Sequence, residues 1–270
     1  MRIVKLRDIS ELKTGPFGTQ FRASEYVTEG IPVINVKNIG YGSLLVSGLD
    51  HVSENTLERL SEHKLQEGDI VFGRKGSVDR HCLIRKGQDG WMQGSDCIRV
   101  RFTDAIVYPE FVSYYLLTDA VKMKINNSAV GSTMASLNTD ILGDIDIILP
   151  DCEEQKRIAL ILGTIDKKIS NNNQINDYLC AQLQILFSYL FNISVMPESW
   201  TQGVLADIAN ITMGQSPSGE SFNTQGNGYP FYQGSTDFGT IFPAKRMYTD
   251  KPSRYAAVFD TLLSARAPAG

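Results

Sequence analysis

The fold is decided by residues 148–159, ILPDCEEQKRIA, which are typical of a strand end followed at once by a helix start. Pro150 ends the apolar run, because proline has no N–H to donate to a sheet. Asp151 followed three residues later by Glu154 is the signature of a helix N-terminus, where the first side chain caps a backbone N–H of the first turn. We therefore predict that a sheet domain meets a helix at residues 150–151.

That helix is predicted to be very long. Up to about residue 192 the chain contains no further proline and one glycine, Gly163. At alternating steps of four and three come Ile158, Leu162, Ile165, Ile169, Asn172, Asn176, Leu179, Leu183, Leu186 and Leu190. Such a heptad pattern favours a coiled coil over a helix packed on its own domain, and the asparagines would fix the register. Some 40 residues make a rod of roughly 60 Å.

The chain repeats itself on the two sides of this helix. Leu6-Asp8-Ile9 returns as Leu205-Asp207-Ile208, and Gly15 returns as Gly214. Residues 30–34 return as 228–232, and residues 68–72 with Arg74 return as 260–264 with Arg266. Because an internal repeat sets the architecture, we predict two similar modules. They are a domain over 1–150, a spacer helix over 151–195 and a truncated second copy over 196–270.

The first module is predicted to be a mixed α/β domain. Strands are expected at 31–36, 69–72, 97–102 and 145–149, where short apolar runs are bounded by turn residues. One helix is expected at 53–64, capped by Ser53, and another at 109–124, opened by Pro109. Residues 134–142 are expected to form a polar loop.

Composition excludes a uniformly basic protein. The 270 residues carry a formal net charge of -4, with 42% hydrophobic and 21% charged residues, as in ordinary globular proteins. A local excess of basic residues does occur between Asp69 and Arg101, with seven Lys or Arg against four Asp. On sequence alone this stretch fits a solvated surface as well as a binding face.

Zinc, secretion and membrane insertion are disfavoured. The four cysteines and three histidines have no metal-ligand spacing. Charged residues interrupt the first eight positions, where a signal peptide would need an apolar run, and no apolar run approaches ~18 residues. We expect a cytoplasmic protein with reduced thiols.

No catalytic signature is found. The sequence lacks a phosphate-binding GxxxxGK[ST], a dinucleotide fingerprint, an HExxH motif and the Asn-Pro-Pro-aromatic motif of amino-methyltransferases. The letters of a PD-(D/E)xK nuclease site do occur in Asp151, Glu154 and Lys156. However, those two carboxylates are one helical turn apart, whereas a nuclease holds them on adjacent strands. Polar, glycine-flanked loops such as 13–15, 35–38, 73–76 and 126–138 instead carry side chains suited to base edges and phosphates.

Taken together, these motifs resemble the target-recognition domain of type I restriction–modification specificity subunits. The resemblance is carried by Leu6-Asp8-Ile9, by residues 68–76, by residues 131–138 and above all by the junction 148–159. The helix around residues 165–169 resembles the spacer helix of that family, and residues 266–270 resemble a turn of its second recognition domain. The resemblance covers essentially the whole chain and implies truncation within the second domain.

The resemblance implies a DNA-binding subunit without catalysis of its own. Such subunits read a split sequence in double-stranded DNA, one half per recognition domain. They dock modification subunits, which methylate adenine with S-adenosylmethionine, and restriction subunits, which translocate and cut DNA with ATP and Mg²⁺. This chain would bind no cofactor itself, and its spacer helix would be free to form a homodimer. We expect the DNA-facing side of residues 1–150 to be lined by Lys13, Lys37, Asn38, Arg74, Lys75, Arg80, Asn127, Ser132 and Asn138.

Two other classes of function stay open at this point. The chain could be a nuclease or methyltransferase in its own right, or a coiled-coil dimerisation protein that does not bind DNA. Activity of the purified chain alone would favour the first. DNA binding measured with and without partner subunits distinguishes the second from a recognition subunit.

Overall fold

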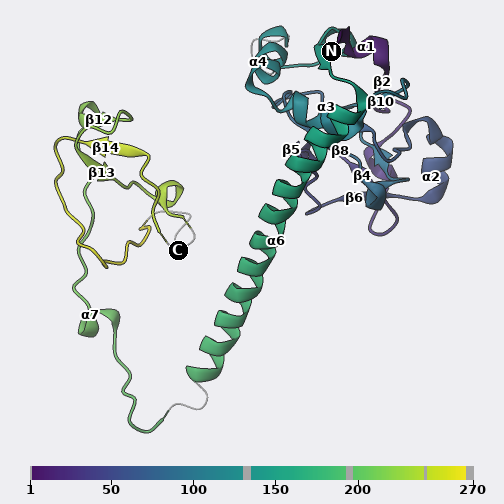
Figure 1. The fold of residues 1–270 in the computed structure, drawn as a ribbon. Coiled ribbons are helices and arrows are strands. Elements are labelled where there is room, and N and C mark those ends of the chain that lie inside the picture. The colour runs from purple at the N-terminus through teal and green to yellow at the C-terminus, as the bar shows by residue number, and fades with distance from the viewer. Residues whose placement is uncertain (1, 130–134, 193–196, 240–241, 266–270) are drawn as a thin grey trace. The chain divides into compact units, whose positions relative to one another are not determined.

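A computed structural model describes residues 2–129, 135–192, 197–239 and 242–265. The chain divides into two compact units, Met1–Phe187 and Ser188–Gly270, which are described separately (Figure 1). Within the described residues, no helix combines the length and the apolar character needed to cross a membrane.

A five-stranded sheet forms the centre of the first unit. Its strands run in the order β2 (Ser10–Thr14), β10 (Cys97–Phe102), β7 (Ile70–Gly73), β8 (His81–Leu83) and β5 (Tyr41–Gly42). Neighbouring strands are antiparallel except β8 and β5, which are parallel. Every residue of β7 is buried, so this strand is covered on both faces and forms the middle of the core.

Two smaller sheets complete this unit. One has the order β3 (Tyr26–Val27), β6 (Asp50–Val52), β4 (Ile31–Ile34) and β9 (Met92–Gln93). The other pairs β1 (Arg2–Lys5) with β11 (Asp146–Leu149), antiparallel. This last pairing joins the start of the unit to the strand that leads into the long helix.

The helices of the first unit follow the expected caps, with two corrections. Ser53 caps α2 (Glu54–Arg59), which continues as the 3-10 turn η3 (Ser61–His63). The single helix expected at 109–124 is wrong: α3 (Pro109–Leu116) ends before Thr118, whose backbone is extended, and α4 (Asp119–Ser128) starts after it. The polar loop expected at 134–142 is also wrong in part, since Asn138 caps α5 (Thr139–Gly143). The remaining short elements are α1 (Leu6–Ile9), η1 (Ala23–Glu25), η2 (Val36–Asn38) and η4 (Lys86–Gln88).

The long helix is confirmed as α6 (Cys152–Leu190). Asp151 caps it, with Oδ1 accepting the Glu154 N–H at 2.9 Å. In a full capping box the Glu154 side chain would reach back to the backbone N–H of Asp151. Here both carboxylate oxygens of Glu154 instead accept bonds from the Arg157 guanidinium at 2.7 Å. The predicted start of the helix is therefore confirmed. Asp151 caps it as expected, whereas Glu154 binds Arg157.

Gln155 fixes the start of α6 to the domain. Its side chain is 1% exposed. Its Nε2 donates to the carbonyl oxygens of Ile106 (3.1 Å) and Pro150 (3.0 Å), and its Oε1 accepts the Tyr108 N–H (2.9 Å). One amide group thus satisfies three backbone groups from the end of β11 and the loop before α3, at the point where the helix begins.

We expect Gln155→Leu to lower the free energy of unfolding of the first unit by about 2–4 kcal/mol, since it leaves buried backbone groups without partners. Urea unfolding followed by circular dichroism measures this. Gln182→Leu, at an exposed position of the same helix, is the matched control and should change the unfolding free energy by less than about 0.5 kcal/mol. Equal effects of the two substitutions would contradict the role given to Gln155.

Only the first turns of α6 pack on the domain. Ile158 and the buried Ala159 join the main core, and Tyr114 on α3 donates its hydroxyl to Asp166 Oδ2 at 2.7 Å. Partial burial, with Asp166 as acceptor, raises the pKa of Tyr114 to about 12. Beyond Asp166 every residue of the helix is exposed. The predicted seam is therefore half-buried at Ile158 and Leu162 and exposed from Ile165 onward.

The described part of the second unit repeats one small sheet of the first in topology and register. The sheet β12 (Phe222–Asn223), β14 (Met247–Thr249), β13 (Tyr229–Phe231) has the order of β3, β6, β4. Phe222 and Tyr229 both pair with Thr249, as Tyr26 and Ile31 both pair with Val52. The short helix α7 (Leu205–Ile208) corresponds to α1, and the turns η6 (Gly219–Ser221) and η7 (Ser235–Asp237) correspond to η1 and η2.

A shared glycine position explains one landmark of the repeat. A Cβ on Gly30 would lie 2.3 Å from the Val52 carbonyl oxygen, and a Cβ on Gly228 would lie 2.3 Å from that of Thr249. Both glycines also have positive φ, so a side chain is excluded twice over.

The last landmark of the repeat does not form the expected element. Residues 260–264 have no strand, whereas the corresponding residues of the first copy lead into β7. In the first copy β7 is held between β10 and β8, and the described part of the second unit contains no counterparts of these two strands. Arg266, the final residue of this landmark, lies outside the described residues.

Candidate nucleic-acid interface

The ends of several strands meet at one edge of the first unit. The Gly94 N–H donates to the Ile34 carbonyl at 2.9 Å, and the Asp96 carbonyl accepts the Arg74 N–H at 2.8 Å. The Arg74 carbonyl in turn accepts the Leu137 N–H at 2.8 Å. We call the surface that these segments form the loop rim, which comprises Gly15 and residues 35–37, 74–76, 94–96 and 135–138.

Glycines allow the backbones of the loop rim to lie this close. A Cβ on Gly15 would be 1.9 Å from the Gly94 carbonyl oxygen, and a Cβ on Gly94 would be 2.2 Å from Asn35 Oδ1. Only glycine fits such positions, because any side chain would displace backbone. Residues distant in sequence are thus held at fixed mutual positions, which suits the recognition of an extended ligand.

Three predicted basic residues come together on the loop rim. Lys37 Nζ lies 2.8 Å from Asp50 Oδ2, and Lys75 Nζ lies 3.0 Å from Asp96 Oδ1. The hydrogen bond from Lys37 lowers the pKa of Asp50. Arg74 is half-buried, and its Nε has no hydrogen-bond partner within the described parts of the chain. Exposed ion pairs of this kind contribute little stability, so either lysine can leave its aspartate for a phosphate at small cost.

Arg80 lies in a neighbouring group arranged around Tyr41. The guanidinium carbon of Arg80 is 5.3 Å from the centre of the Tyr41 ring, and Lys122 Nζ of α4 is 5.7 Å from it. Cations at these distances are attracted to the ring face. One exposed tyrosine therefore brings together two basic residues from the β7–β8 loop and from α4. Sequence reasoning missed Tyr41 and Lys122, and the only local signal was the Gly40-Tyr41-Gly42 turn.

The other predicted residues are used differently. Asn38 is fully buried: its Nδ2 donates to the Leu45 and Ser47 carbonyls at 3.1 and 3.4 Å, so it shapes a loop and has no exposed surface to offer a ligand. Lys13 bonds to Glu62. Asn138 reaches the loop rim, but its Oδ1 accepts the Ile141 N–H at 2.8 Å as a helix cap.

Two predicted residues are not among those that define the loop rim. Asn127 is exposed on α4, and Ser132 lies outside the described residues. The residue most clearly missed is Asn35, whose Nδ2 donates to Asp50 Oδ2 at 2.9 Å and whose Oδ1 lies against Gly94. The sequence contained no signal for this contact beyond the Asn-Val-Lys-Asn string.

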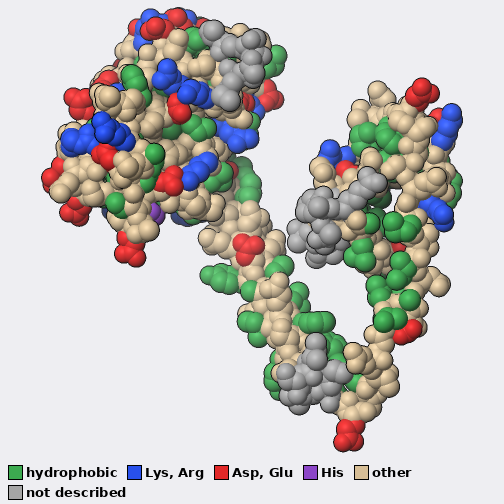
Figure 2. Space-filling model, turned by 180° about the vertical axis from the view of Figure 1, so that it is seen from behind, with side chains coloured by type: hydrophobic (Ala, Val, Ile, Leu, Met, Phe, Trp, Pro, Cys, Tyr) green, Lys and Arg blue, Asp and Glu red, His purple; other side chains and the backbone are tan. Residues whose placement is uncertain are grey.

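On the visible, described surface of the first unit in Figure 2, positive charge is not gathered into one continuous patch. On the face that Figure 2 presents, Lys and Arg side chains of the first unit alternate with Asp and Glu. Hydrophobic side chains are visible along the projecting part of α6 in the same view. On a surface of this kind, a polyanion would be held by a few individually positioned basic side chains, not by the electrostatic attraction of a uniformly positive face.

His81, Cys82 and Cys97 are buried in the core, and burial shifts the pKa of each away from the range useful for catalysis. Burial lowers the pKa of His81 to about 4, and its Nε2 lies 3.0 Å from Ser113 Oγ. Burial raises the pKa of Cys82 to about 12 and also raises that of Cys97. None of these groups is a ready nucleophile or base near neutral pH. Across the parts of the chain that the structure describes, no three His, Cys, Asp or Glu residues are grouped as for a metal ion.

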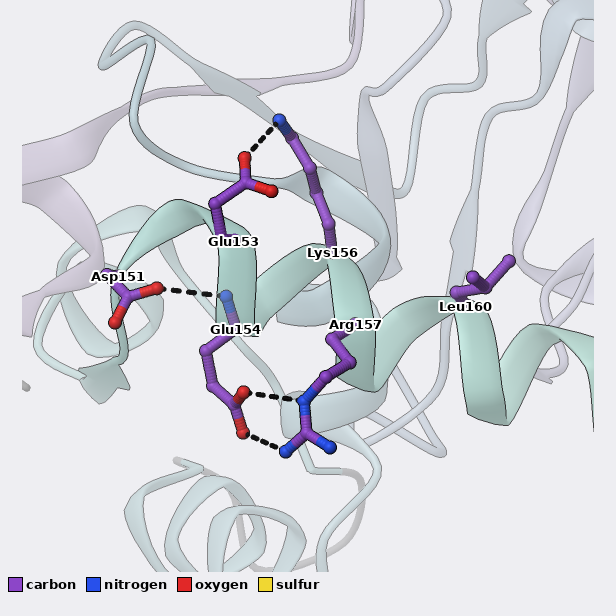
Figure 3. A pocket seen from close by; sticks show the side chains of 6 residues that line it. All are labelled: Asp151, Glu153, Glu154, Lys156, Arg157 and Leu160. Atoms are coloured by element: carbon purple, nitrogen blue, oxygen red, sulfur yellow. Dashed lines mark hydrogen bonds and ion pairs between the residues drawn. The ribbon is translucent and has the colours of Figure 1, made fainter.

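The nuclease-like string has the geometry of a helix start. Figure 3 shows a shallow hollow at the beginning of α6, lined by acidic and basic side chains of the first turns. Asp151 is turned to the Glu154 N–H, Glu154 to Arg157, and Glu153 to Lys156 at 2.9 Å (Figure 3). Each carboxylate already has a local partner, and they do not converge on one point.

Known proteins resemble this chain in both fold and sequence. The type I restriction-modification S subunit from M. genitalium matches with a TM-score of 0.51 at 17% identity, over 93% of this chain and 69% of that chain. This likeness confirms the predicted class, a mixed α/β domain with a long helix. In sequence, the chain is 28% identical over 267 residues to a Methanocaldococcus jannaschii protein described as the type I restriction enzyme MjaX specificity subunit. The match covers 89% of this chain and 61% of that relative.

A second relative, the type I restriction enzyme MjaVIII specificity subunit of the same organism, is 25% identical over 175 residues, covering 62% of this chain and 40% of the relative. The chain therefore spans less than two thirds of the length of these relatives. The model of the type I restriction modification DNA specificity domain matches residues 1–180, which include the loop rim and the first part of α6. The chain belongs to the family of type I restriction modification DNA specificity domains.

Proposed function

We propose that the chain is a sequence-specific, double-stranded DNA-binding subunit of a type I restriction–modification complex. The observation that carries this proposal is the family match over residues 1–180. The loop rim gives it a physical basis, because it holds Lys37, Arg74 and Lys75 at fixed positions on one edge of the domain. Phosphate contacts by such residues set the position on the duplex, and neighbouring polar groups read base edges.

In this proposal the chain directs chemistry that other subunits perform. Modification subunits would methylate adenine with S-adenosylmethionine, and restriction subunits would cleave with ATP and Mg²⁺, in the cytoplasm. Residues 1–150 would be the first recognition domain, 151–195 the spacer and 196–270 part of the second. The helix-start geometry at Asp151 and the suppressed core thiols support a subunit without catalysis of its own.

The seam of α6 supports a homodimer as a further part of the proposal. In an antiparallel pair centred between positions 172 and 176, Ile165 would face Leu183 of the second copy and Leu162 would face Leu186. Every apolar seam residue then faces another apolar one, and Asn172 meets Asn176 of the second copy at the centre. Buried asparagines that find each other fix register. Such a dimer would carry two identical recognition domains and read an inverted repeat.

The proposal is tested by comparing the chain alone with the reconstituted complex. The purified chain, given DNA, Mg²⁺, ATP and S-adenosylmethionine, should leave DNA uncut and unmethylated. Together with the modification subunits of its own system it should produce adenine methylation at one defined sequence, found by sequencing the DNA for methylated bases. Activity of the chain alone that is lost in Asp151→Ala would refute the proposal and favour a nuclease.

A further inference from the structure

Asp96 differs from Asp50, which is also paired with a lysine of the loop rim, in how it is held. Its carbonyl oxygen is fixed by the Arg74 N–H at 2.8 Å. Its carboxylate is about half exposed and is paired with Lys75 at 3.0 Å. In the comparable pair, Asp50 Oδ2 accepts a bond from Asn35 Nδ2 at 2.9 Å as well as from Lys37 at 2.8 Å. If its lysine moved away, Asp50 would keep Asn35 as a partner, whereas Asp96 has no second side-chain donor among the residues that the structure describes.

Every base pair of a duplex offers one such donor in the major groove, but its place depends on which strand carries the adenine or the cytosine. In the major groove the exocyclic amino groups, N4 of cytosine and N6 of adenine, donate hydrogen bonds, and carboxylates are suited to accept them. Guanine and thymine present acceptors at the corresponding positions, which would leave a carboxylate facing lone pairs. Phosphate oxygens, in contrast, are present at every step and attract Lys75 regardless of sequence.

Resting on the function proposed above, we propose that Asp96 is a specificity-determining residue that accepts a hydrogen bond from an exocyclic base amino group. When Asp96 makes this bond, Lys75 is released to a backbone phosphate, so both members of the pair exchange one partner for another. At a base pair without a suitably placed amino group, Asp96 keeps Lys75 and the phosphate contact is not made. The pair therefore couples a sequence-independent contact to a sequence-dependent one.

The Arg74 backbone supports this exchange. Arg74 donates to the Asp96 carbonyl and also accepts from Leu137, and these backbone bonds do not depend on the side-chain pair, so they are kept when the pair opens. Only the side chains of Asp96 and Lys75 need to rotate, and both are about half exposed. The short side chain of Asp96 would reach the base edge, and the long side chain of Lys75 would reach a neighbouring phosphate of the same duplex.

The test is Asp96→Asn in the complex reconstituted from the full chain and its modification subunits. Removing the carboxylate frees Lys75, so affinity for a duplex without the recognition sequence should rise about threefold to tenfold, with a log–log salt dependence steeper by up to about 0.9. One position of the methylated sequence should relax, and that position should be cytosine or adenine in the unchanged protein. Which of the two bases is found there distinguishes the two amino groups.

Two variants serve as controls. Asp104→Asn removes the same charge from an exposed pair with Arg2, 2.8 Å apart, beyond the opposite end of β10, and should alter neither the affinity nor the methylated sequence. Asp50→Asn should raise affinity for all duplexes alike without relaxing any position. If Asp96→Asn raises affinity but leaves the methylated sequence intact, Asp96 only competes for Lys75 and the proposed readout is overturned. A complex of the unchanged chain that methylates no defined sequence would instead refute the proposed function.

Discussion

The double substitution Leu179→Asp and Leu183→Asp is expected to weaken self-association of the chain at least about a thousandfold. In the antiparallel pair these leucines face Ile169 and Ile165, and all four are about half exposed in the single chain. Burying one large aliphatic side chain contributes about 1.5–3 kcal/mol, and a symmetric dimer loses four leucines. Sedimentation at micromolar concentration should change from dimer to monomer.

The matched control is Ala181→Asp with Gln184→Asp, which adds the same two charges at exposed positions outside the heptad seam. This variant should remain dimeric. The comparison is best made on residues 1–270 and on a chain shortened to residues 1–195, since the second unit exposes apolar side chains of its own, among them Phe242 and Phe259. A soluble 1–195 chain that stays monomeric at these concentrations would refute the paired helix.

The sequence predicted those elements whose local signals agree with their packing. The start of α6 is one case, because Asp151 supplies the cap and Pro150 ends the strand. The strand 97–102 is another, and it is confirmed residue for residue as β10. The repeat was also visible in sequence, because the glycine at positions 30 and 228 is demanded by a backbone contact that both copies share.

Errors occurred where tertiary contacts decide between local alternatives. The break between α3 and α4 at Thr118 follows no proline or glycine, so helical periodicity alone continued the helix through it. The DNA contact of Asn138 stays a prediction, because this exposed side chain also serves as the N-cap of α5. Asn38 was chosen because it is polar, but two loop carbonyls needed a donor and the side chain became buried.

Residues of the loop rim were predictable as a set of polar loops, but not as a surface. Lys37 and Lys75 are far apart in sequence, but both lie beside the turn 94–96. They do so because Gly94 contacts the backbone of Ile34 and Asp96 contacts that of Arg74. Nothing in the order of the residues indicates these contacts. The same holds for Gln155, which was noted as part of a motif but whose three backbone partners come from two other segments.

The triple substitution Lys37→Ala, Arg74→Ala and Lys75→Ala is expected to weaken DNA binding of the reconstituted complex about a hundredfold at 0.15 M salt. Three lost phosphate contacts should reduce the slope of log affinity against log salt by about 2.7, since each contributes about 0.9 in duplex DNA. The methylated sequence should stay the same, because phosphate contacts carry no base information. Relaxation of one position would mean that at least one of the three residues reaches a base edge, and the single substitutions would then identify it.

The control for this triple variant removes three basic residues that are ion-paired and exposed elsewhere in the same unit. These are Arg2, paired with Asp104, Lys5, paired with Asp146, and Arg85, paired with Glu110. Their replacement by alanine changes the net charge by the same amount and should leave the salt slope nearly unchanged. Equal slopes for the two triple variants would mean that only overall charge matters. The loop rim would then not be the surface that faces DNA, because a docked surface must lose more affinity than a distant one bearing the same charge.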